Sequence, residues 1–373
     1  MKIGFDAKRA FLNQSGLGNY SRNLLSSLFR YFPGHDYLLY TTKRSDISFS
    51  RSLGQRKNVS VITPDNFIDK KLGGRWRSYG ITPLLNQAQA GVYHGLSNEL
   101  PFNIHKFSGK KIVTIHDLIF LRYPELYPAL DRKIYDKKFR KACAAADLIL
   151  AVSRQTASDL QEFYGIPEKK IKVIYQSCNE AFYSPPAAAE AARIREKYKL
   201  PERYLLYVGT IEERKNLLTV VKALREVKDV PLVAVGKKKG YFSEVAALIK
   251  EYGLGPRIFL PDQVNNEELP AIYRGAELFI YPSVFEGFGI PVLEALTSRV
   301  PVITTRGGCF AEAGGPHSSY IDPMNAEELA AEINAILASP ERRSRMAEAG
   351  YAHALGFAPE RIAAQLMHVY QGT

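Results

Sequence analysis

Short runs of Val, Ile, Leu and Tyr alternate with longer amphipathic stretches along the whole of this 373-residue chain. Short continuous apolar runs separated by helical patterns are typical of buried parallel strands in β-α-β units. A first series of predicted strands covers Lys2–Asp6, Tyr37–Thr41, Val59–Ile62, Gly91–His94, Ile112–His116, Leu148–Val152 and Ile171–Ile174. A second series covers Tyr204–Val208, Pro231–Gly236, Ile258–Leu260, Leu278–Tyr281, Pro301–Thr304 and Ser319–Ile321. The sequence therefore predicts an α/β protein of two doubly wound domains.

The segment Ser184–Ala189, rich in Pro and Ala, separates the two series and is the best candidate for a linker. We expect an N-terminal domain over residues 1–180 and a C-terminal domain over residues 181–355. A terminal amphipathic helix within residues 356–373 is expected to pack back on the first domain. Ligands of such sheets bind beyond the carboxyl ends of the strands, so we expect the site in a cleft between the domains.

The composition favours a cytoplasmic protein without a metal or disulfide framework. The three cysteines, Cys143, Cys178 and Cys309, lie far apart and form no CxxC pair. The polar opening MKIGFDAK predicts no signal peptide, and no apolar run reaches the length of a membrane-spanning helix. There is no Asp-x-Asp motif, so we expect a metal-independent enzyme without a cofactor.

The net charge of +12 is concentrated in one half of the chain. Residues 1–178 hold 28 Lys and Arg against 14 Asp and Glu, a net +14, whereas the remainder has a net −2. Such a bias points to an anionic partner. No nucleic-acid-binding signature is present. We therefore favour an anionic surface at the inner face of the plasma membrane, with a solvated basic face as the alternative.

The segment Ser283–Ala295 follows a predicted strand and holds two acidic residues, Glu286 and Glu294. Gly287 and Gly289 permit a tight turn, and the amides of the helix that follows favour electron-rich groups. Two carboxylates so placed can bind different hydroxyls of one polyhydroxylated ligand. The alternative is a solvated glutamate at each position.

A pair of cations, Arg214 and Lys215, follows the first predicted strand of the second domain. Adjacent cations at a strand end can hold a pyrophosphate, Arg as a planar fork and Lys as a point charge. Asn216 is expected to cap the helix that follows. A surface basic pair is the alternative.

In the first domain, Gly16 and Gly18 lie between the first strand and the first helix, where backbone amides can approach a phosphate. The full dinucleotide-binding pattern GxGxxG is absent because position 21 is Ser21. This mismatch argues against an NAD-dependent enzyme.

Polar residues also end two strands of the first domain. His116 and Asp117 follow the apolar run Ile112–Ile115, and His94 ends another run. Side chains at these ends are expected to face the cleft, where a histidine can hydrogen-bond a sugar hydroxyl. Each histidine could instead be bonded within the protein.

The segment Arg132–Lys141 has a basic helical pattern with Tyr135 and Phe139 on one face, and the only tryptophan, Trp76, lies between two arginines. These features fit contact with an anionic membrane. The alternative is that the aromatic side chains pack inward and the charges are solvated.

Taken together, these motifs resemble retaining glycosyltransferases of the GT-B fold, specifically glycosyltransferase family 4. Residues 286–294 are similar to the family's E-x7-E motif, and Pro301–Thr304 and Ile321–Pro323 continue its pattern. Residues 16–20 and Thr114–Leu118 resemble the surface-polysaccharide and mannosyltransferase-like subgroup. The chain departs from the family at Thr210, at Ser298 with Arg299, and at Glu312 with Ala313.

The resemblance implies two Rossmann-like domains facing across a cleft, with the acceptor on the first and a nucleotide sugar on the second. It implies these donor-binding residues: Gly16, Gly18, Thr210, Arg214, Lys215, Glu286, Gly287, Phe288, Gly289, Ile290 and Glu294. His116, Glu286, Arg214 and Lys215 are the implied catalytic residues, and His94 and Asp117 are expected on the acceptor side.

The implied reaction transfers a hexose, with retention, from a nucleoside-diphosphate sugar to a saccharide or polyprenyl-linked saccharide during surface-polysaccharide synthesis. A GDP-mannose-like donor is favoured, with a UDP sugar next. The alternatives are a GT-B-like sugar-nucleotide epimerase and a non-catalytic nucleotide-binding protein.

Overall fold

A computed structural model describes residues 1–45, 47–65 and 67–372, so Thr373, the last residue of the predicted terminal helix, lies outside the described residues. The chain forms two compact units. Unit 1 comprises Met1–Ser177 and Pro359–Thr373, and unit 2 comprises Cys178–Ala358. The chain therefore leaves unit 1 once and returns to it for its last helix.

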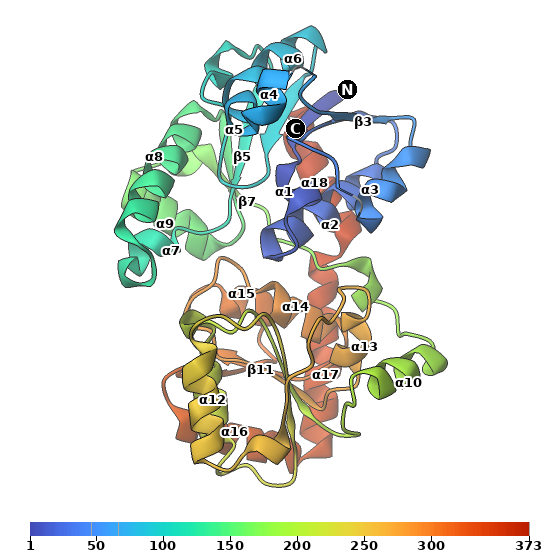
Figure 1. The fold of residues 1–373 in the computed structure, drawn as a ribbon, viewed down its shortest axis with the longest axis vertical. Helices are drawn as coiled ribbons and strands as arrows, with labels where there is room; N and C mark the ends of the chain where they lie inside the picture. The colour runs from blue at the N-terminus through green and yellow to red at the C-terminus, as the bar shows by residue number, and fades with distance from the viewer. Residues whose placement is uncertain (46, 66, 373) are drawn as a thin grey trace. The chain divides into compact units, whose positions relative to one another are not determined.

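Unit 1 is built on a parallel sheet of seven strands in the order β3-β2-β1-β4-β5-β6-β7 (Figure 1). The strands are β1 (Lys2–Asp6), β2 (Asp36–Tyr40), β3 (Val59–Ile62), β4 (Val92–Gly95), β5 (Lys110–Ile115), β6 (Leu148–Ala151) and β7 (Ile171–Val173). Successive residues of a strand point to opposite faces, and both faces are buried. In β5, Ile112 joins one apolar cluster while Val113 and Ile115 join another.

Unit 2 repeats this arrangement with six parallel strands in the order β10-β9-β8-β11-β12-β13. They are β8 (Leu205–Val208), β9 (Leu232–Val235), β10 (Ile258–Phe259), β11 (Leu278–Tyr281), β12 (Val302–Thr305) and β13 (Ser319–Ile321). The order reverses between β8 and β11, which are neighbours in the sheet. Every predicted strand is present, with ends within two residues of the prediction.

Helices cover both sheets. In unit 1 they are α1 (Lys8–Leu12), α2 (Gly16–Tyr31), α3 (Ser48–Ser52), α4 (Phe67–Lys71), α5 (Gly73–Arg75), α6 (Ile81–Gln87), α7 (Ile119–Arg122), α8 (Ala129–Ala145), α9 (Arg154–Tyr164) and α18 (Pro359–Gln371). A π-helical turn, Trp76–Gly80, joins α5 to α6. Local sequence explains the ends of α9: the Ser153 hydroxyl accepts from the amide of Thr156, and Gly165 ends the helix at a φ of 63°.

Unit 2 contains α10 (Ala188–Lys197), α11 (Leu217–Ala223), α12 (Phe242–Glu251), α13 (Leu269–Arg274), α14 (Ile290–Thr297), α15 (Phe310–Gly314), α16 (Ala326–Leu337) and α17 (Pro340–Ala354). The side chains of Asn325 and Ser339 cap α16 and α17. Neither α16 nor α17, nor any other helix within the described ranges, is long and apolar enough to cross a membrane.

The predicted linker does not lie at the boundary between the units. Ser184–Ala187 already belongs to unit 2, and the rest of the predicted segment begins α10. The reason is packing: Phe182, which precedes the segment, is buried against Tyr273, and its carbonyl accepts from Arg274 at 3.2 Å. The proline-rich segment is thus a connection within unit 2.

The terminal helix α18 completes the core of unit 1. Figure 1 shows this red helix beside the blue helix α2, and Ile362, Leu366 and Met367 share an apolar cluster with Leu24 and Leu25. The apolar face of α18 is therefore buried by residues that lie more than three hundred positions earlier in the chain.

Candidate active site

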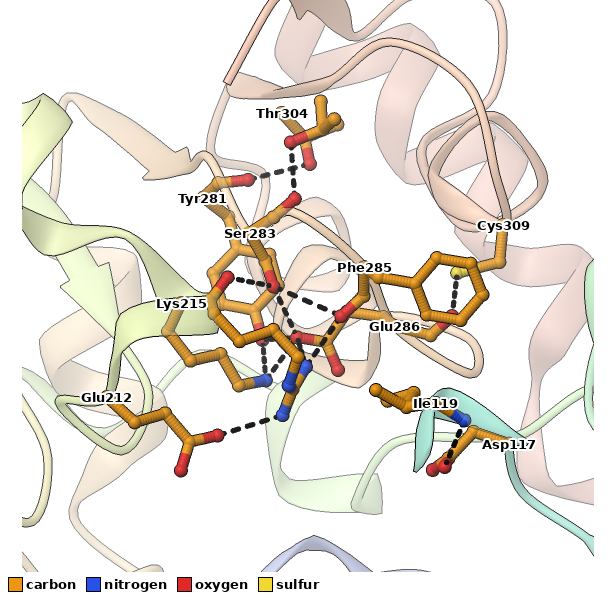
Figure 2. Close-up of polar contacts among 12 residues, drawn as sticks. Asp117, Ile119, Glu212, Lys215, Tyr281, Ser283, Phe285, Glu286, Thr304 and Cys309 are labelled. Carbon is orange, nitrogen blue, oxygen red and sulfur yellow. Dashed lines mark hydrogen bonds and ion pairs between the residues drawn. The ribbon is translucent and has the colours of Figure 1, made fainter. Parts of the chain in front are cut away.

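A cluster of charged and polar side chains surrounds the Glu286 carboxylate in unit 2 (Figure 2). Its oxygen Oε1 accepts hydrogen bonds from the Tyr281 hydroxyl at 2.9 Å and the Ser283 hydroxyl at 2.7 Å. The same atom pairs with Nη1 of Arg214 at 2.8 Å and with the ammonium group of Lys215. The carboxylate of Glu286 is thereby fixed by four donors.

The cluster lies where the strand order of the second sheet reverses, because its residues follow β8 and β11. The loops after these strands are bonded to each other: the carbonyl of Arg214 accepts from the amide of Val284 at 2.8 Å, and the Arg214 guanidinium donates to the carbonyl of Phe285 at 2.6 Å. Such reversal points are where open α/β sheets bind ligands. The sheet topology thus brings together Arg214, Lys215 and Glu286.

The charges of the cluster are strongly coupled. Burial alone would raise the pKa of Glu286, but the charges of Arg214 and Lys215 and the hydrogen bonds outweigh burial and hold its pKa at about 2. Burial lowers the pKa of Lys215, an effect that the negative charge of Glu286 opposes. Glu212 pairs with Arg214 at 2.9 Å and also with Lys239. Three cations and two carboxylates leave the cluster with one excess positive charge.

Glu294, the second acidic residue of the motif, lies on α14 in a different environment. It is half-buried and accepts a hydrogen bond from the Tyr273 hydroxyl at 2.9 Å. Burial raises its pKa to about 7, although this hydrogen bond opposes the rise. The two glutamates of the motif therefore differ in charge state near neutral pH: Glu286 is fully ionised, and Glu294 is about half protonated.

The turn between the two glutamates depends on Gly289, whose φ of 109° is one that residues with a side chain rarely adopt. This glycine immediately precedes α14. Phe288 is buried against Phe357, with ring centroids 5.6 Å apart, so its side chain serves packing, and only its backbone is available to a donor. Gly287 and Ile290, which flank Phe288 and Gly289 in the sequence, are half-buried.

Asn216 precedes α11 but does not cap it, contrary to the prediction. It has a left-handed backbone with a φ of 56°, and no side-chain capping bond forms. Its side chain accepts from Thr219 at 2.9 Å and donates to the carbonyl of Pro323 at 2.6 Å. Thr210, where many family members have an arginine, is half-buried just beyond β8.

In unit 1, Gly16 and Gly18 form the first turn of α2 instead of a loop before it, which corrects the prediction. A Cβ atom on Gly18 would lie 1.8 Å from the carbonyl oxygen of Asn13, so packing of the preceding loop already demands glycine there. A Cβ atom on Gly16 would meet no described atom within 4 Å. Gly16 is thus the residue of the pair whose backbone is open to a ligand.

His116 is buried at the end of β5, and all its polar atoms have partners within unit 1. Its Nε2 lies 2.9 Å from the carbonyl oxygen of Leu96, and its Nδ1 lies 2.9 Å from the Gln176 amide nitrogen. The backbone amide donates to Asn98, and the carbonyl accepts from Thr156. Burial lowers the pKa of His116 to about 4, so the ring is neutral. The expectation of a ring free to bind sugar is not met.

The assignment of His94 to the acceptor side is wrong. The residue is fully buried, with Nδ1 2.7 Å from the Tyr370 hydroxyl on α18 and Nε2 2.7 Å from the Thr114 hydroxyl. Burial lowers its pKa to about 3. His94 is a core residue that joins β4, β5 and α18. Asp117, by contrast, is half-buried, and its carboxylate accepts from the amide of Ile119 at 3.3 Å.

Sequence reasoning missed Tyr281 and Ser283. Both lie at the end of β11 and donate to Glu286. The available signal was position, since Tyr281 ends the strand and Ser283 precedes Glu286 by three residues. No group of three or more His, Cys, Asp or Glu suited to a metal ion occurs among residues 1–45, 47–65 and 67–372.

The residues predicted to contact a membrane differ in their exposure to solvent. Trp76 is buried beside Tyr40 and cannot lie on a surface, which corrects that expectation. Phe139 is also buried, against Phe120, whereas Tyr135 remains 37% exposed. The predicted basic helix is present as α8.

Two family models match consecutive parts of the chain. The model described as "Glycosyltransferase Family 4" matches residues 14–181, and the model described as "Glycosyl transferases group 1" matches residues 190–353. Together they span nearly all of units 1 and 2. The chain belongs to glycosyltransferase family 4.

Curated relatives of this family 4 glycosyltransferase include mannosyltransferases. It is 29% identical over 287 residues to O-antigen chain mannosyltransferase B from Escherichia coli, a match that covers 75% of this chain and 74% of that protein. It is 27% identical over 235 residues to O-antigen chain mannosyltransferase RfbU from Salmonella typhimurium, with 62% of each chain covered. That second match spans less than two thirds of RfbU. These relatives confirm the predicted resemblance to the mannosyltransferase-like subgroup.

Solved structures share the fold over the whole chain. Sucrose-phosphate synthase from Thermosynechococcus elongatus has a TM-score of 0.79 at 20% identity, covering 100% of this chain and 98% of that chain. Anabaena Alr3699/HepE in complex with UDP and glucose has a TM-score of 0.77 at 18% identity, with both chains covered completely. The predicted GT-B fold of two Rossmann-like domains is confirmed for this family 4 glycosyltransferase.

Proposed function

We propose that this glycosyltransferase transfers a hexose, with retention of anomeric configuration, from a nucleoside-diphosphate sugar to a saccharide or polyprenyl-linked saccharide acceptor. A GDP-mannose-like donor is favoured and a UDP sugar is next. The mannosyltransferase names of its relatives support this donor and a role in surface-polysaccharide synthesis. The observation that carries the proposal is the Arg214–Lys215–Glu286 cluster at the strand-order reversal of unit 2.

The two cations of the cluster have the chemistry of a diphosphate clamp. When the bond between the sugar's anomeric carbon and the diphosphate oxygen breaks, negative charge develops on the departing phosphate. Arg214 and Lys215 are already held in place by Glu286 and by the carbonyl of Phe285, so little reorganisation is needed as that charge appears. The net positive charge of the cluster favours the leaving group.

The Glu286 carboxylate has a different role from the two cations. With a pKa of about 2 it carries no proton near neutral pH, so it cannot serve as a general acid. It can accept hydrogen bonds from the sugar's hydroxyls and stabilise positive charge at the anomeric carbon. The acceptor oxygen bonds to that carbon on the face that the diphosphate leaves, and the acceptor's proton passes to the departing phosphate oxygen. Overall, one glycosidic bond replaces the bond to the diphosphate.

The remaining predicted residues have supporting roles in this proposal. Glu294 binds the ribose hydroxyls, and the backbone at Thr210, Gly287 and Gly289 lines the donor site. Gly16, in unit 1, stays a predicted phosphate-binding residue. Because the polar atoms of His116 are all bonded within unit 1, we assign it to positioning the end of β5 instead of to direct contact with sugar.

Membrane association has structural support on α8. Leu130 and Ile134 are 69% and 42% exposed, and the exposed residues Lys137 and Lys141 continue the same helical face at spacings of three and four. Exposed apolar residues beside lysines on one helix suit the interface of an anionic bilayer. We therefore place the enzyme peripherally on the inner face of the plasma membrane, where a polyprenyl-linked acceptor is accessible.

The test is a thermal-unfolding screen with GDP, UDP, ADP and dTDP, followed by transfer assays with sugar forms of any nucleotide that stabilises the protein. A nucleotide at 100 times its dissociation constant should stabilise the fold by about 2.7 kcal/mol through linkage. We expect GDP to give the largest shift. A shift without turnover of any sugar form would favour the non-catalytic nucleotide-binding alternative, and conversion of the sugar nucleotide without transfer would favour the epimerase. Absence of any shift together with absence of turnover would overturn the proposal.

A further inference from the structure

A hollow of about 440 Å³ lies in unit 1, beyond the carboxyl ends of the three strands β1, β2 and β3. Its lining includes Lys8 after β1, Lys43 and Arg44 after β2, and Lys70 on α4. Thr42 and Thr63 add two hydroxyl groups. These residues come from separate segments that only the parallel sheet brings to one place.

The residues that line this hollow carry positive charge and no carboxylate. Within the described part of the chain none of the four cationic groups forms an ion pair. The nearest acid at the end of β1, Asp6, is already held by Arg77, whose Nε donates to it at 2.8 Å. The pKa of Lys8 is lowered, first by burial and then by the charge of Arg77, which outweighs the opposing charge of Asp6.

A second, smaller hollow of about 120 Å³ adjoins the first, since both are lined by Lys8 and Gly74. Its lining mixes apolar residues with charged and polar ones, among them Ser78, Glu99 and Tyr93. The Tyr93 hydroxyl is buried and has no hydrogen-bond partner among the described residues. A buried hydroxyl without a partner is rare in folded proteins and often marks a position where a ligand or water completes the bonding.

We propose that the larger hollow binds the phosphate or diphosphate group of an anionic acceptor, and that the smaller one receives hydroxyl groups of the attached saccharide. This inference rests on the proposed transferase function and specifies its acceptor class. Four cations and two hydroxyls are the donors that phosphate oxygens require, and Arg adds a planar fork. The charged and hydroxyl side chains that line the smaller hollow include both donors and acceptors, which hydroxyl groups need.

The experiment compares two variants of equal charge change. Lys43→Gln combined with Lys70→Gln removes two exposed cations from the hollow. Lys57→Gln combined with Lys169→Gln removes two exposed lysines elsewhere in unit 1. Affinity for inorganic diphosphate is measured by isothermal titration calorimetry, with the donor site saturated by the nucleotide that the unfolding screen selects.

We expect the first variant to bind diphosphate at least ~10-fold more weakly than wild type, with the second unchanged, since only the first loses charge-assisted bonds to the anion. Equal losses in both variants would mean that only overall charge attracts the anion, and would overturn the proposal. Unchanged affinity in the first variant, or no binding by wild type, would overturn it as well.

Two further titrations separate the source of the phosphate. Mannose 1-phosphate tests a soluble sugar phosphate, and vesicles of phosphatidylglycerol test a lipid surface. We expect the Lys43→Gln, Lys70→Gln variant to lose affinity for the sugar phosphate and to keep vesicle binding. Unchanged affinity for the sugar phosphate together with weakened vesicle binding would overturn the proposal. Nucleotide-induced stabilisation is measured in parallel: its retention in the variant keeps the donor-site assignment independent of the outcome here.

Discussion

Lys215 and Glu286 form an ion pair at the point where the second sheet reverses its strand order, and Tyr281 contacts both charged groups. The side chains of the pair are only 12% and 13% exposed. An ion pair with so little solvent contact is weak support for stability, because desolvation offsets much of the attraction. Its position at a ligand-binding edge instead favours a functional role, in which the pair holds two opposite charges ready for the donor.

Lys215→Ala should reduce the rate of sugar transfer by at least ~100-fold while the protein stays folded, because one preformed donor to the departing diphosphate is lost. The measurement is the transfer rate at saturating donor, together with the unfolding temperature. Lys237→Ala is the matched control, since Lys237 is exposed on a neighbouring loop of unit 2 and should leave the rate unchanged. A rate near that of wild type in Lys215→Ala would reject the clamp.

Glu286→Gln should lower transfer strongly and should also change how stability depends on acid. The folded pKa of Glu286 is about 2 against an ordinary 4.5, so its contribution to stability is present above pH 4.5 and is lost as pH falls towards 2. The variant should lose less stability than wild type across this window. Chemical denaturation at several pH values measures the free energy of unfolding. If this free energy depends on pH in the same way in the two proteins, the assigned charge state is contradicted.

Glu294→Gln should have the opposite pH signature. Burial raises the folded pKa to about 7, so between pH 4.5 and 7 the unfolded chain releases a proton that the folded chain keeps. Wild-type stability should therefore fall as pH rises through this window, by up to roughly 3 kcal/mol. The variant should lack that fall and should bind nucleotide more weakly. A pH-independent wild-type stability, or unchanged nucleotide affinity, would count against the assignment.

His116→Ala should destabilise the protein by about 1–3 kcal/mol, because it leaves the Leu96 carbonyl and the Gln176 amide without their partner. If His116 only positions the end of β5, His116→Gln should recover much of the transfer rate. The donor's KM should then change less than kcat. Normal stability in His116→Ala combined with a large rise in the donor's KM would indicate direct contact with sugar instead.

Leu130→Ser combined with Ile134→Ser should weaken sedimentation with phosphatidylglycerol vesicles several-fold, because each exposed apolar side chain contributes to burial in the bilayer interface. Vesicle binding by wild type should also fall as salt rises. A matched change at the exposed Leu72 of unit 1 serves as the control. Vesicle binding that changes neither with salt nor in the Leu130→Ser, Ile134→Ser variant would contradict the membrane proposal.

The strands and the position of the donor cluster could be predicted from sequence because both depend on local pattern. An apolar run signals a buried strand, and polar residues directly after it lie at the sheet edge. This reasoning located Arg214, Lys215 and Glu286. It could not show that Oε1 of Glu286 receives four donors, since that requires the side-chain positions of two loops.

The failures came from contacts that the pattern of strands and helices does not reveal. His94 looks like a site residue because it ends a strand, yet Tyr370, 276 positions later, covers it. Gly18 looks like part of a phosphate loop, yet the close approach of Asn13 explains the glycine. The basic hollow was not predicted because its cations lie in segments that the sheet alone brings together.

The most direct test of the central claim is a crystal structure of the enzyme bound to its nucleoside diphosphate. The account predicts diphosphate oxygens within hydrogen-bonding distance of Lys215 and Arg214, with the ribose hydroxyls at Glu294. A nucleotide bound elsewhere, with Glu286 still fully paired and Arg214, Lys215 and Glu294 untouched by the ligand, would contradict the account.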